Sequence, residues 1–423
     1  MQYGLLGRTL AHSFSPPIHN ALADYDYRLF EMEEEALAAF IRRPDIGGLN
    51  VTIPYKQTVM PLCDTLSPTA ARIGSVNTLV YDEARRITGH NTDYEGLCWQ
   101  LRYAGINPRG KKAALLGNGG VCRTVQAVLS DLGAREIVVV SRTRTDTTVS
   151  YDDTAAYTDA ELVVNTTPVG MYPHCPDAVM SLDRFPHLQG FVDMIYNPLR
   201  TVMMLEAEAR GIPCCNGLPM LVAQAKAAVE LFTGNPVPDE KTEEVLRTLI
   251  TRQSNVVLVG MPGCGKSTVG RELAKQLNLR FIDLDEEIIR AAGMSIPALF
   301  EQGGEPLFRE WERRVTADIG KTGGAVIATG GGVVLDKQNY APLAQNGCIV
   351  WLTRPLSQLA TEGRPLSKDA AALEAMYRVR APRYTRFADL TVENRDTPDR
   401  TATAIVHLLQ QASPLGAPKG VTA

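Results

Sequence analysis

The chain has 423 residues, of which 45% are hydrophobic and 21% are charged, and its net charge at pH 7 is -4. This composition is typical of globular domains, and the length predicts about two to four of them. A weakly acidic chain without an apolar run of roughly 18 residues is not expected to bind nucleic acid or to enter a membrane.

The first residues, 1–7, predict a buried strand and not a signal peptide, because a basic flank and a long apolar stretch are both missing. Eight cysteines are scattered without a Cys-x-x-Cys pair, and the six histidines lack the spacing of metal ligands. We therefore expect a reduced, cytoplasmic protein without structural zinc.

Short β-branched runs alternate with helical patterns over most of the chain. The expected strands include residues 48–53, 112–116, 136–140, 256–259 and 348–352. This alternation predicts an α/β fold with largely parallel sheets.

A glycine-rich turn, Gly117-Asn118-Gly119-Gly120-Val121, lies between an expected strand and an expected helix. It is an imperfect form of the dinucleotide-binding fingerprint. The next expected strand ends in Ser141-Arg142-Thr143-Arg144, where an NAD site typically carries an acid. Two arginines and two hydroxyls favour the extra phosphate of NADP, although a solvated basic turn is the plainer alternative.

Seven polar motifs occur in order along the N-terminal part of the chain. They are His12-Ser13-Phe14-Ser15-Pro16, Asn50–Lys56, Ser75–Thr78, Asn91-Thr92-Asp93, Asn165–Met171, Asp193–Pro198 and Gly217–Ala225. Any one of them could be a capped turn or a buried polar network. Together they resemble the shikimate dehydrogenase family over about residues 3–233, which implies a substrate domain, a Rossmann domain and reduction of 3-dehydroshikimate with NADPH.

The resemblance also implies roles for individual residues. The substrate carboxylate would meet Ser13, Ser15 and Tyr196, and the ring hydroxyls would meet Thr52, Asn77 and Gln224. The catalytic pair would be Lys56 and Asp93, because a lysine near the keto oxygen can supply a proton and a carboxylate can orient it. By itself, Lys56 could equally be an ordinary surface lysine.

Two features depart from the usual pattern of this family. The segment between Asn20 and Leu49 is shorter than usual and is acidic at 31–35, and Asn118 stands where alanine is common. Neither departure falls on an expected catalytic residue.

The strongest motif in the C-terminal part is Gly260-Met261-Pro262-Gly263-Cys264-Gly265-Lys266-Ser267-Thr268. It fits the P-loop pattern, in which backbone N–H groups hold phosphates, the lysine reaches the β- and γ-phosphates and the first hydroxyl binds Mg²⁺. The run Phe281-Ile282-Asp283-Leu284-Asp285 follows. We expect it to be extended, with both carboxylates on one face, unless it is an exposed edge strand.

Several further motifs complete this part of the chain. They are Gly303-Gly304-Glu305, Phe308–Glu312, Ala328-Thr329-Gly330-Gly331-Gly332, Gly363-Arg364-Pro365-Leu366 and Arg380–Tyr384. With the P-loop, they resemble the shikimate kinase family over about residues 255–411. The resemblance implies ATP-dependent phosphorylation of shikimate on a P-loop parallel sheet.

The kinase resemblance again implies individual roles. Asp285 would orient the attacking hydroxyl, and Asp283 would support Mg²⁺. The substrate carboxylate would be clamped by Arg309 and Arg380, with backbone contacts from Gly331 and Gly332. Arg364 would neutralise the transferring phosphoryl group from a lid that is shorter than usual and lacks a second arginine near Ser357 or Gln358.

These patterns predict the domain organisation. The substrate domain of the dehydrogenase is expected at 1–97 plus 217–250 and its Rossmann domain at 98–216. A polar linker is expected at 251–255, the kinase at 256–411 and a disordered tail at 412–423, so that each half should fold alone.

Two other functions remain as alternatives. A regulatory protein built from decayed enzyme domains would have lost its catalytic residues, whereas Lys56, Asp93, Lys266 and Asp285 are all present. The sequence poorly distinguishes a dehydrogenase that acts on quinate from one that acts on shikimate, because the two compounds share the carboxylate and hydroxyl pattern.

Overall fold

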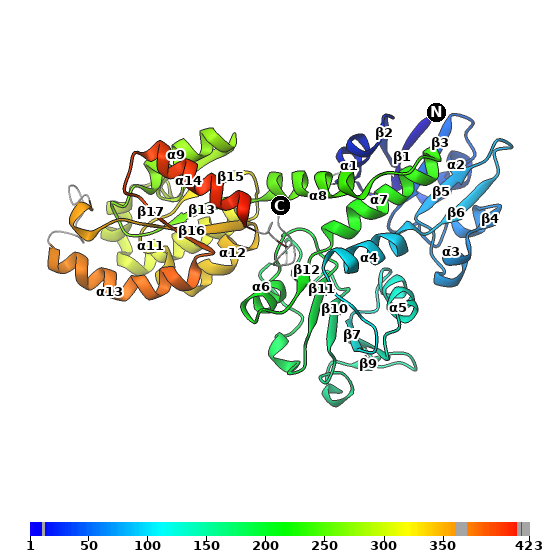
Figure 1. Ribbon diagram of the computed structural model, residues 1–423, viewed down its shortest axis with the longest axis horizontal. Coiled ribbons are helices and arrows are strands. Elements are labelled where there is room, and N and C mark those ends of the chain that lie inside the picture. Colours follow the sequence, from blue (N-terminus) through cyan, green and yellow to red (C-terminus); the bar gives the residue numbers. More distant parts are fainter. Residues whose placement is uncertain (11–12, 174, 360–369, 413–415, 417–423) are drawn as a thin grey trace. The chain divides into compact units, whose positions relative to one another are not determined.

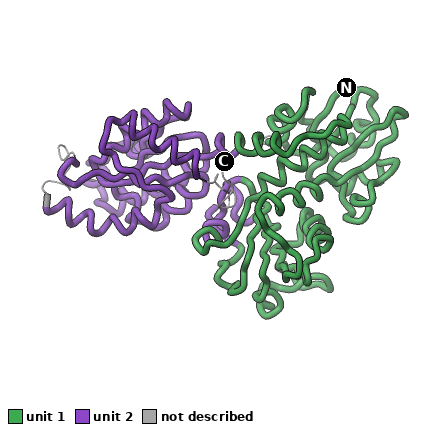
Figure 2. The backbone as a smooth tube through the Cα atoms, in the orientation of Figure 1, with its two compact units in different colours: residues 1–168, 179–196, 207–249 green, residues 169–178, 197–206, 250–423 purple. Residues whose placement is uncertain are grey.

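The computed structural model of the chain describes residues 1–10, 13–173, 175–359, 370–412 and 416. The chain divides into two compact units, which Figure 2 colours separately. Unit 1 contains residues 1–168, 179–196 and 207–249, and unit 2 contains residues 169–178, 197–206 and 250–423. Arg364 and most of the expected tail lie outside the described residues.

Unit 1 begins with a six-stranded mixed sheet. Its strand order is β2-β1-β3-β5-β6-β4, with β1 parallel to β2 and β3, and β5 antiparallel to β3 and β6. The strands are β1 (Gln2–Gly7), β2 (Tyr27–Glu31), β3 (Ile46–Val51), β4 (Thr65–Leu66), β5 (Thr78–Tyr81) and β6 (Ile87–His90). The expected first strand is therefore confirmed, while β3 ends before the expected Ile53.

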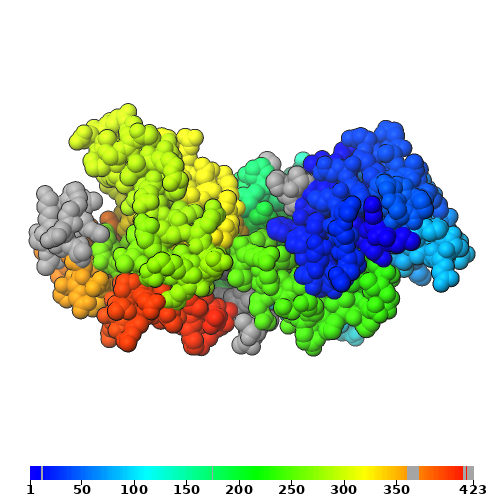
Figure 3. Space-filling model, turned by 90° about the horizontal axis from the view of Figure 1, so that it is seen from above, coloured from blue at the N-terminus to red at the C-terminus, as the bar shows by residue number. Residues whose placement is uncertain are grey.

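Short helices and one long helix accompany this sheet. The short ones are α1 (Ser15–Leu22), α2 (Leu37–Ile41) and α3 (Pro68–Ile73). The long helix α7 (Leu218–Thr233) lies beside the N-terminal segment in both views (Figures 1 and 3). The ring of Phe232 lies 5.4 Å from the ring of Tyr3, so the end of α7 contacts β1.

The second sheet of unit 1 is wholly parallel, as the strand–helix alternation predicted (Figure 1). Its order, β12-β11-β10-β7-β8-β9, is that of a Rossmann-type doubly wound sheet. The strands are β7 (Lys112–Leu116), β8 (Glu136–Ser141), β9 (Val149–Ser150), β10 (Leu162–Asn165), β11 (Gly190–Asp193) and β12 (Cys214–Cys215). The accompanying helices are α4 (Thr92–Tyr103), α5 (Cys122–Asp131) and α6 (Val202–Ala209).

Helices α4 and α7 pack against each other. Gly96 permits this approach, because a Cβ atom there would stand 2.8 Å from the carbonyl oxygen of Met220. The close packing brings the first turn of α4 beside the first half of α7, where candidate site residues lie.

Unit 2 contains a five-stranded parallel sheet of order β14-β15-β13-β16-β17. Its strands are β13 (Asn255–Val259), β14 (Arg280–Asp283), β15 (Ala325–Ala328), β16 (Gly347–Thr353) and β17 (Leu390–Glu393). Its helices are α9 (Lys266–Leu277), α10 (Leu284–Ala292), α11 (Ile296–Gly320), α12 (Tyr340–Gln345), α13 (Ala370–Phe387) and α14 (Pro398–Gln411). The central strand β13 is buried along its whole length, as expected of a parallel sheet covered on both faces.

The polar linker that we expected at residues 251–255 is instead the end of a helix and the start of a strand. Helix α8 (Asp239–Gln253) runs on to Gln253, and β13 begins at Asn255, so that only Ser254 separates them. In addition, two segments that we expected in the Rossmann domain belong to unit 2. Among the described residues, no helix is both long and apolar enough to cross a membrane.

Candidate active sites

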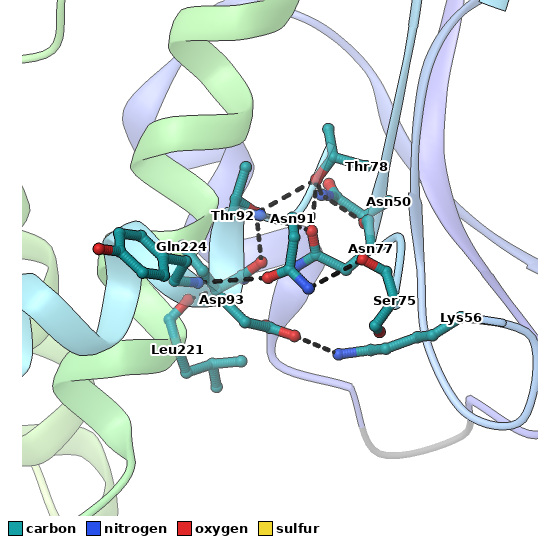
Figure 4. Close-up of polar contacts among 11 residues, drawn as sticks. Asn50, Lys56, Ser75, Asn77, Thr78, Asn91, Thr92, Asp93, Leu221 and Gln224 are labelled. Atoms are coloured by element: carbon teal, nitrogen blue, oxygen red, sulfur yellow. Dashed lines mark hydrogen bonds and ion pairs between the residues drawn. The ribbon is translucent and has the colours of Figure 1, made fainter. Parts of the chain in front are cut away.

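The expected catalytic pair of the N-terminal part is brought together in unit 1. Lys56 lies in the turn that follows β3, and Asp93 lies in the first turn of α4, which Asn91 caps through its side chain. The Lys56 Nζ atom is 2.6 Å from Asp93 Oδ2 (Figure 4). The Lys56 side chain is 29% exposed and that of Asp93 is 13% exposed, so the ammonium group can still reach a ligand.

A buried polar network supports this pair. Asn77 Oδ1 accepts hydrogen bonds from the backbone N–H of Thr92, at 2.7 Å, and from its hydroxyl, at 3.2 Å. The Thr92 hydroxyl also lies 3.5 Å from Gln224 Oε1, and Gln224 Nε2 donates to the carbonyl of Leu221 (Figure 4). The structure thus places Asn77 and Gln224 beside Asp93, while Thr52 follows β3 and donates its N–H to Leu6.

The hydroxyls expected at the substrate carboxylate come from two separate segments. Ser15 begins α1 and donates its N–H to the hydroxyl of Ser13 at 3.2 Å. The ring of Tyr196 meets the ring of Phe14 edge-on, with 5.7 Å between centroids. Burial raises the pKa of Tyr196, so its hydroxyl stays protonated at neutral pH and can donate to a carboxylate.

The glycine-rich turn after β7 is tight and partly exposed. Gly117 has φ +106°, and a Cβ atom there would stand 2.6 Å from Cγ2 of Thr167. The hydroxyl of Thr166 donates to the carbonyls of Leu116 and Gly117, at 2.9 Å each, and so fixes the turn. Residues 118–120 are exposed, so their backbone is open to a ligand.

The basic turn after β8 lies on the surface. Arg142, Thr143 and Arg144 are exposed, and Ser141 is partly buried. Arg144 lies 3.5 Å from Asp153 at the edge of a hollow of about 330 Å³. An exposed pair of this length is weak, so a phosphate group could replace the carboxylate.

The P-loop joins β13 to α9 as predicted. Its glycines at 260, 263 and 265 all have positive φ, from +83° to +150°, which other residues rarely adopt. Lys266 is 9% exposed, and its Nζ donates to the carbonyls of Gly260 and Met261. The Ser267 hydroxyl donates to Asp283 Oδ2 at 2.7 Å, which unites the two expected Mg²⁺ residues.

The prediction that Asp283 and Asp285 share one extended segment was wrong. Strand β14 ends at Asp283, whose side chain caps α10 by accepting the N–H of Asp285 at 3.1 Å. An aspartate followed by an acidic first turn favours a helix start, because the helix dipole stabilises negative charge there. Asp285 nevertheless reaches the glycine segment, since a Cβ atom on Gly330 would stand 3.0 Å from its Oδ1.

The glycine segment after β15 is surrounded by the other expected substrate residues. Arg380 Nη1 donates to the carbonyl of Gly331 at 3.0 Å. A Cβ atom on Gly332 would stand 2.5 Å from Nη2 of Arg309, so the guanidinium lies against the backbone there. The side chains of Asp285, Arg309 and Arg380 therefore lie around residues 330–332, which we call the glycine-lined site.

Glu312 also belongs to this group, although its motif predicted no role for it. Its side chain is fully buried and lies 2.7 Å from Nη1 of Arg309, while Glu305 lies 2.9 Å from Nη2. Burial raises the pKa of Glu312, and the adjacent guanidinium opposes that rise. The i, i+3 spacing of Arg309 and Glu312 on α11 was the available signal.

Comparison with known proteins agrees with both halves of the resemblance. Residues 5–79 match the shikimate dehydrogenase substrate binding domain, and residues 217–247 match the shikimate 5'-dehydrogenase C-terminal domain. Residues 262–410 match shikimate kinase. The two sets of matched residues do not overlap.

Relatives of the N-terminal part extend over nearly their own full length. A shikimate dehydrogenase (NADP(+)) of Clostridium beijerinckii is 38% identical over 246 residues, covering 54% of this chain and 91% of the relative. A solved chorismate mutase/shikimate 5-dehydrogenase fusion protein from Clostridium acetobutylicum is 34% identical, with a TM-score of 0.56, covering 59% of this chain and 96% of that one.

Shikimate 5-dehydrogenase from Thermus thermophilus, solved with NADP(H) and shikimate, is 32% identical, with a TM-score of 0.54. The match covers 59% of this chain and 99% of that one. Together with the two sheets of unit 1 and the P-loop sheet of unit 2, these likenesses show that the chain belongs to the shikimate dehydrogenase family and carries a shikimate kinase domain at residues 262–410.

Proposed function

We propose that this chain catalyses two consecutive reactions: NADPH-dependent reduction of 3-dehydroshikimate to shikimate, and ATP-dependent phosphorylation of the 3-hydroxyl of shikimate. The observation that carries the proposal is the presence of two separately assembled polar sites, the Lys56–Asp93 site and the glycine-lined kinase site. The product of the first reaction is the substrate of the second. The expectation that the chain works in the cytoplasm stays a prediction.

In the dehydrogenase site, proton transfer falls to Lys56. Its ammonium group, held by Asp93 at 2.6 Å, would donate a proton to the oxygen formed from the keto group and recover one from solvent. NADPH, when bound along residues 117–121, supplies the hydride. Ring hydroxyls would be oriented by Asn77 and Gln224, whose positions the buried network fixes.

In the kinase site, charged side chains of the chain would orient the substrate and bind the phosphates. Asp285 would orient the attacking hydroxyl, and Arg309 and Arg380 would bind the carboxylate. ATP, when bound at the P-loop, supplies the phosphoryl group, and Lys266 would turn from its backbone carbonyls to the phosphates. Ser267 and Asp283 would hold Mg²⁺, directly or through water, because a hydroxyl and a carboxylate suit this hard cation.

A substrate panel tests the first reaction against its nearest alternative. Oxidation of shikimate and of quinate by the purified chain is measured with NADP⁺ and with NAD⁺. We expect shikimate with NADP⁺ to give the highest kcat/KM. Faster oxidation of quinate would assign the site to quinate.

A further inference from the structure

Two segments of the dehydrogenase sequence are part of unit 2. Residues 169–178 and 197–206 group with residues 250–423, as Figure 2 shows by colour. The first segment follows β10, and the second follows β11 and includes the start of α6. Both segments make hydrogen bonds with residues of the kinase part of unit 2.

Arg200 makes the most extensive of these contacts. Its side chain is only 4% exposed. Nε and Nη2 donate to the carbonyl of Ala344, at 2.9 and 2.6 Å, and Nη2 also donates to the carbonyl of Gly347 at 2.7 Å. Nη1 lies 3.4 Å from Asp389 Oδ1, so the buried guanidinium meets both a carboxylate and two carbonyls.

The backbone beside Arg200 continues the attachment. Its own N–H donates to the carbonyl of Gln345 at 2.9 Å, and the N–H of Leu199 donates to Asn346 Oδ1 at 2.9 Å. Further along, the side chain of Leu205 belongs to the hydrophobic core built around β13 and β16. Residues 197–206 therefore contribute hydrogen bonds, charge and apolar surface to the same fold.

The other segment reaches the same place through Tyr172. Its hydroxyl donates to the carbonyl of Gly320 at 3.2 Å and lies 3.2 Å from Asn346 Nδ2. Asn346 in turn accepts the N–H of Asn255, the first residue of β13, through its carbonyl. Asn346 thus joins both segments to the start of the central strand.

Most of these partners lie at or just before the amino ends of β13, β16 and β17, and Gly320 ends α11. Asn255 begins β13 and Gly347 begins β16, whereas the P-loop and the glycine segment follow the carboxyl ends of β13 and β15. A buried guanidinium is stable only when its N–H groups are paired, and buried carbonyls likewise need donors. Removing Arg200 would leave the carbonyls of Ala344 and Gly347 without these hydrogen bonds.

We propose that residues 169–178 and 197–206 are a structural part of the kinase, anchored by Arg200, so that the kinase fold depends on the dehydrogenase part of the chain. These two segments of the same chain bind the surface formed at the amino ends of β13 and β16. The kinase is then not a unit that ends at the expected boundary of 251–255. The inference rests on the fold and not on the proposed reactions.

Hydrogen exchange read by mass spectrometry on the full chain tests the proposal, because it reports each strand separately and needs no activity. Arg200→Met keeps the aliphatic stem and removes the donors. The control is Arg210→Met, since Arg210 lies in unit 1 and also donates to two carbonyls, those of Leu182 and Phe185, from a side chain that is 29% exposed.

We expect amides of β13 and β16 to exchange at least about tenfold faster in Arg200→Met, since unpairing a buried charge network typically costs several times the 1.4 kcal/mol that a tenfold change represents. The unfolding midpoint of unit 2 should fall by roughly 5–15 °C. In the Arg210→Met chain these amides should exchange as in the unchanged chain.

Unchanged exchange of β13 and β16 in Arg200→Met would overturn the proposal, as would equal acceleration in the control. If Arg200→Met does not accumulate as folded protein, Arg200→Lys keeps one charge and is measured in the same way. Acceleration that includes β13 and β16 and is confined to unit 2 supports the proposal, and no acceleration of β13 and β16 overturns it.

Discussion

Replacing Lys56 by methionine separates catalysis from stability in unit 1. The substitution keeps the length of the stem and removes the ammonium group that lies 2.6 Å from Asp93. The Lys56 side chain is 29% exposed but that of Asp93 is only 13% exposed, so leaving the carboxylate unpaired costs about 1–3 kcal/mol of stability. Losing a general acid typically lowers turnover 10²–10⁴-fold, which corresponds to about 3–5 kcal/mol of activation free energy. The expected rise in activation free energy is therefore larger than the expected loss of folding stability.

The assay follows NADPH oxidation with 3-dehydroshikimate and, on the same preparation, ATP-dependent phosphorylation of shikimate. Lys226→Met is the matched control, because Lys226 on α7 also pairs with carboxylates, at 3.3 Å from Glu230 and from Asp239. We expect Lys56→Met to lose dehydrogenase turnover and to keep kinase turnover, and Lys226→Met to keep both. A loss of dehydrogenase turnover smaller than about tenfold would refute the role of Lys56.

Three further substitutions test the cofactor and kinase assignments. Arg142→Ala should raise the KM for NADPH about tenfold and leave that for NADH unchanged; Arg135→Ala, before the opposite end of β8, is the control, and equal changes for both cofactors would remove the assignment. Asp283→Asn should raise the Mg²⁺ requirement of the kinase about 10–100-fold, and an unchanged Mg²⁺ titration would contradict its role. Arg364→Ala should lower kinase turnover about 10³-fold, with Arg354 the next candidate if the variant stays active. The short lid also predicts a raised KM for ATP and tolerance of GTP, which nucleotide competition measures; sharp selectivity for ATP would show that another residue covers the base.

Local sequence motifs predicted the two glycine-rich loops, because their backbone conformation requires glycine. The P-loop requires positive φ at 260, 263 and 265, and the turn at Gly117 leaves no room for a Cβ atom, so glycine at these positions is informative by itself. Lys56 and Asp93 were joined only by their place in an ordered set of motifs. Their spacing of 37 residues carries no geometric information.

Other features depend on partners that are distant in sequence. Arg200 is one basic residue in an ordinary stretch, and its acceptors lie more than 140 residues further along the chain. The helix start at Asp283 was misjudged because alternating apolar and acidic residues also fit an acidic first turn. Glu312 was missed because the sequence of a helix does not distinguish a buried glutamate from an exposed one.

The most direct test of a two-reaction enzyme is a coupled assay on one purified preparation of the full chain. It is given 3-dehydroshikimate and NADPH, followed by ATP with Mg²⁺, and each product is identified by mass spectrometry. We expect shikimate before ATP is added and shikimate 3-phosphate afterwards. Failure to form shikimate in the first stage, or failure to phosphorylate added shikimate in the second, would contradict it.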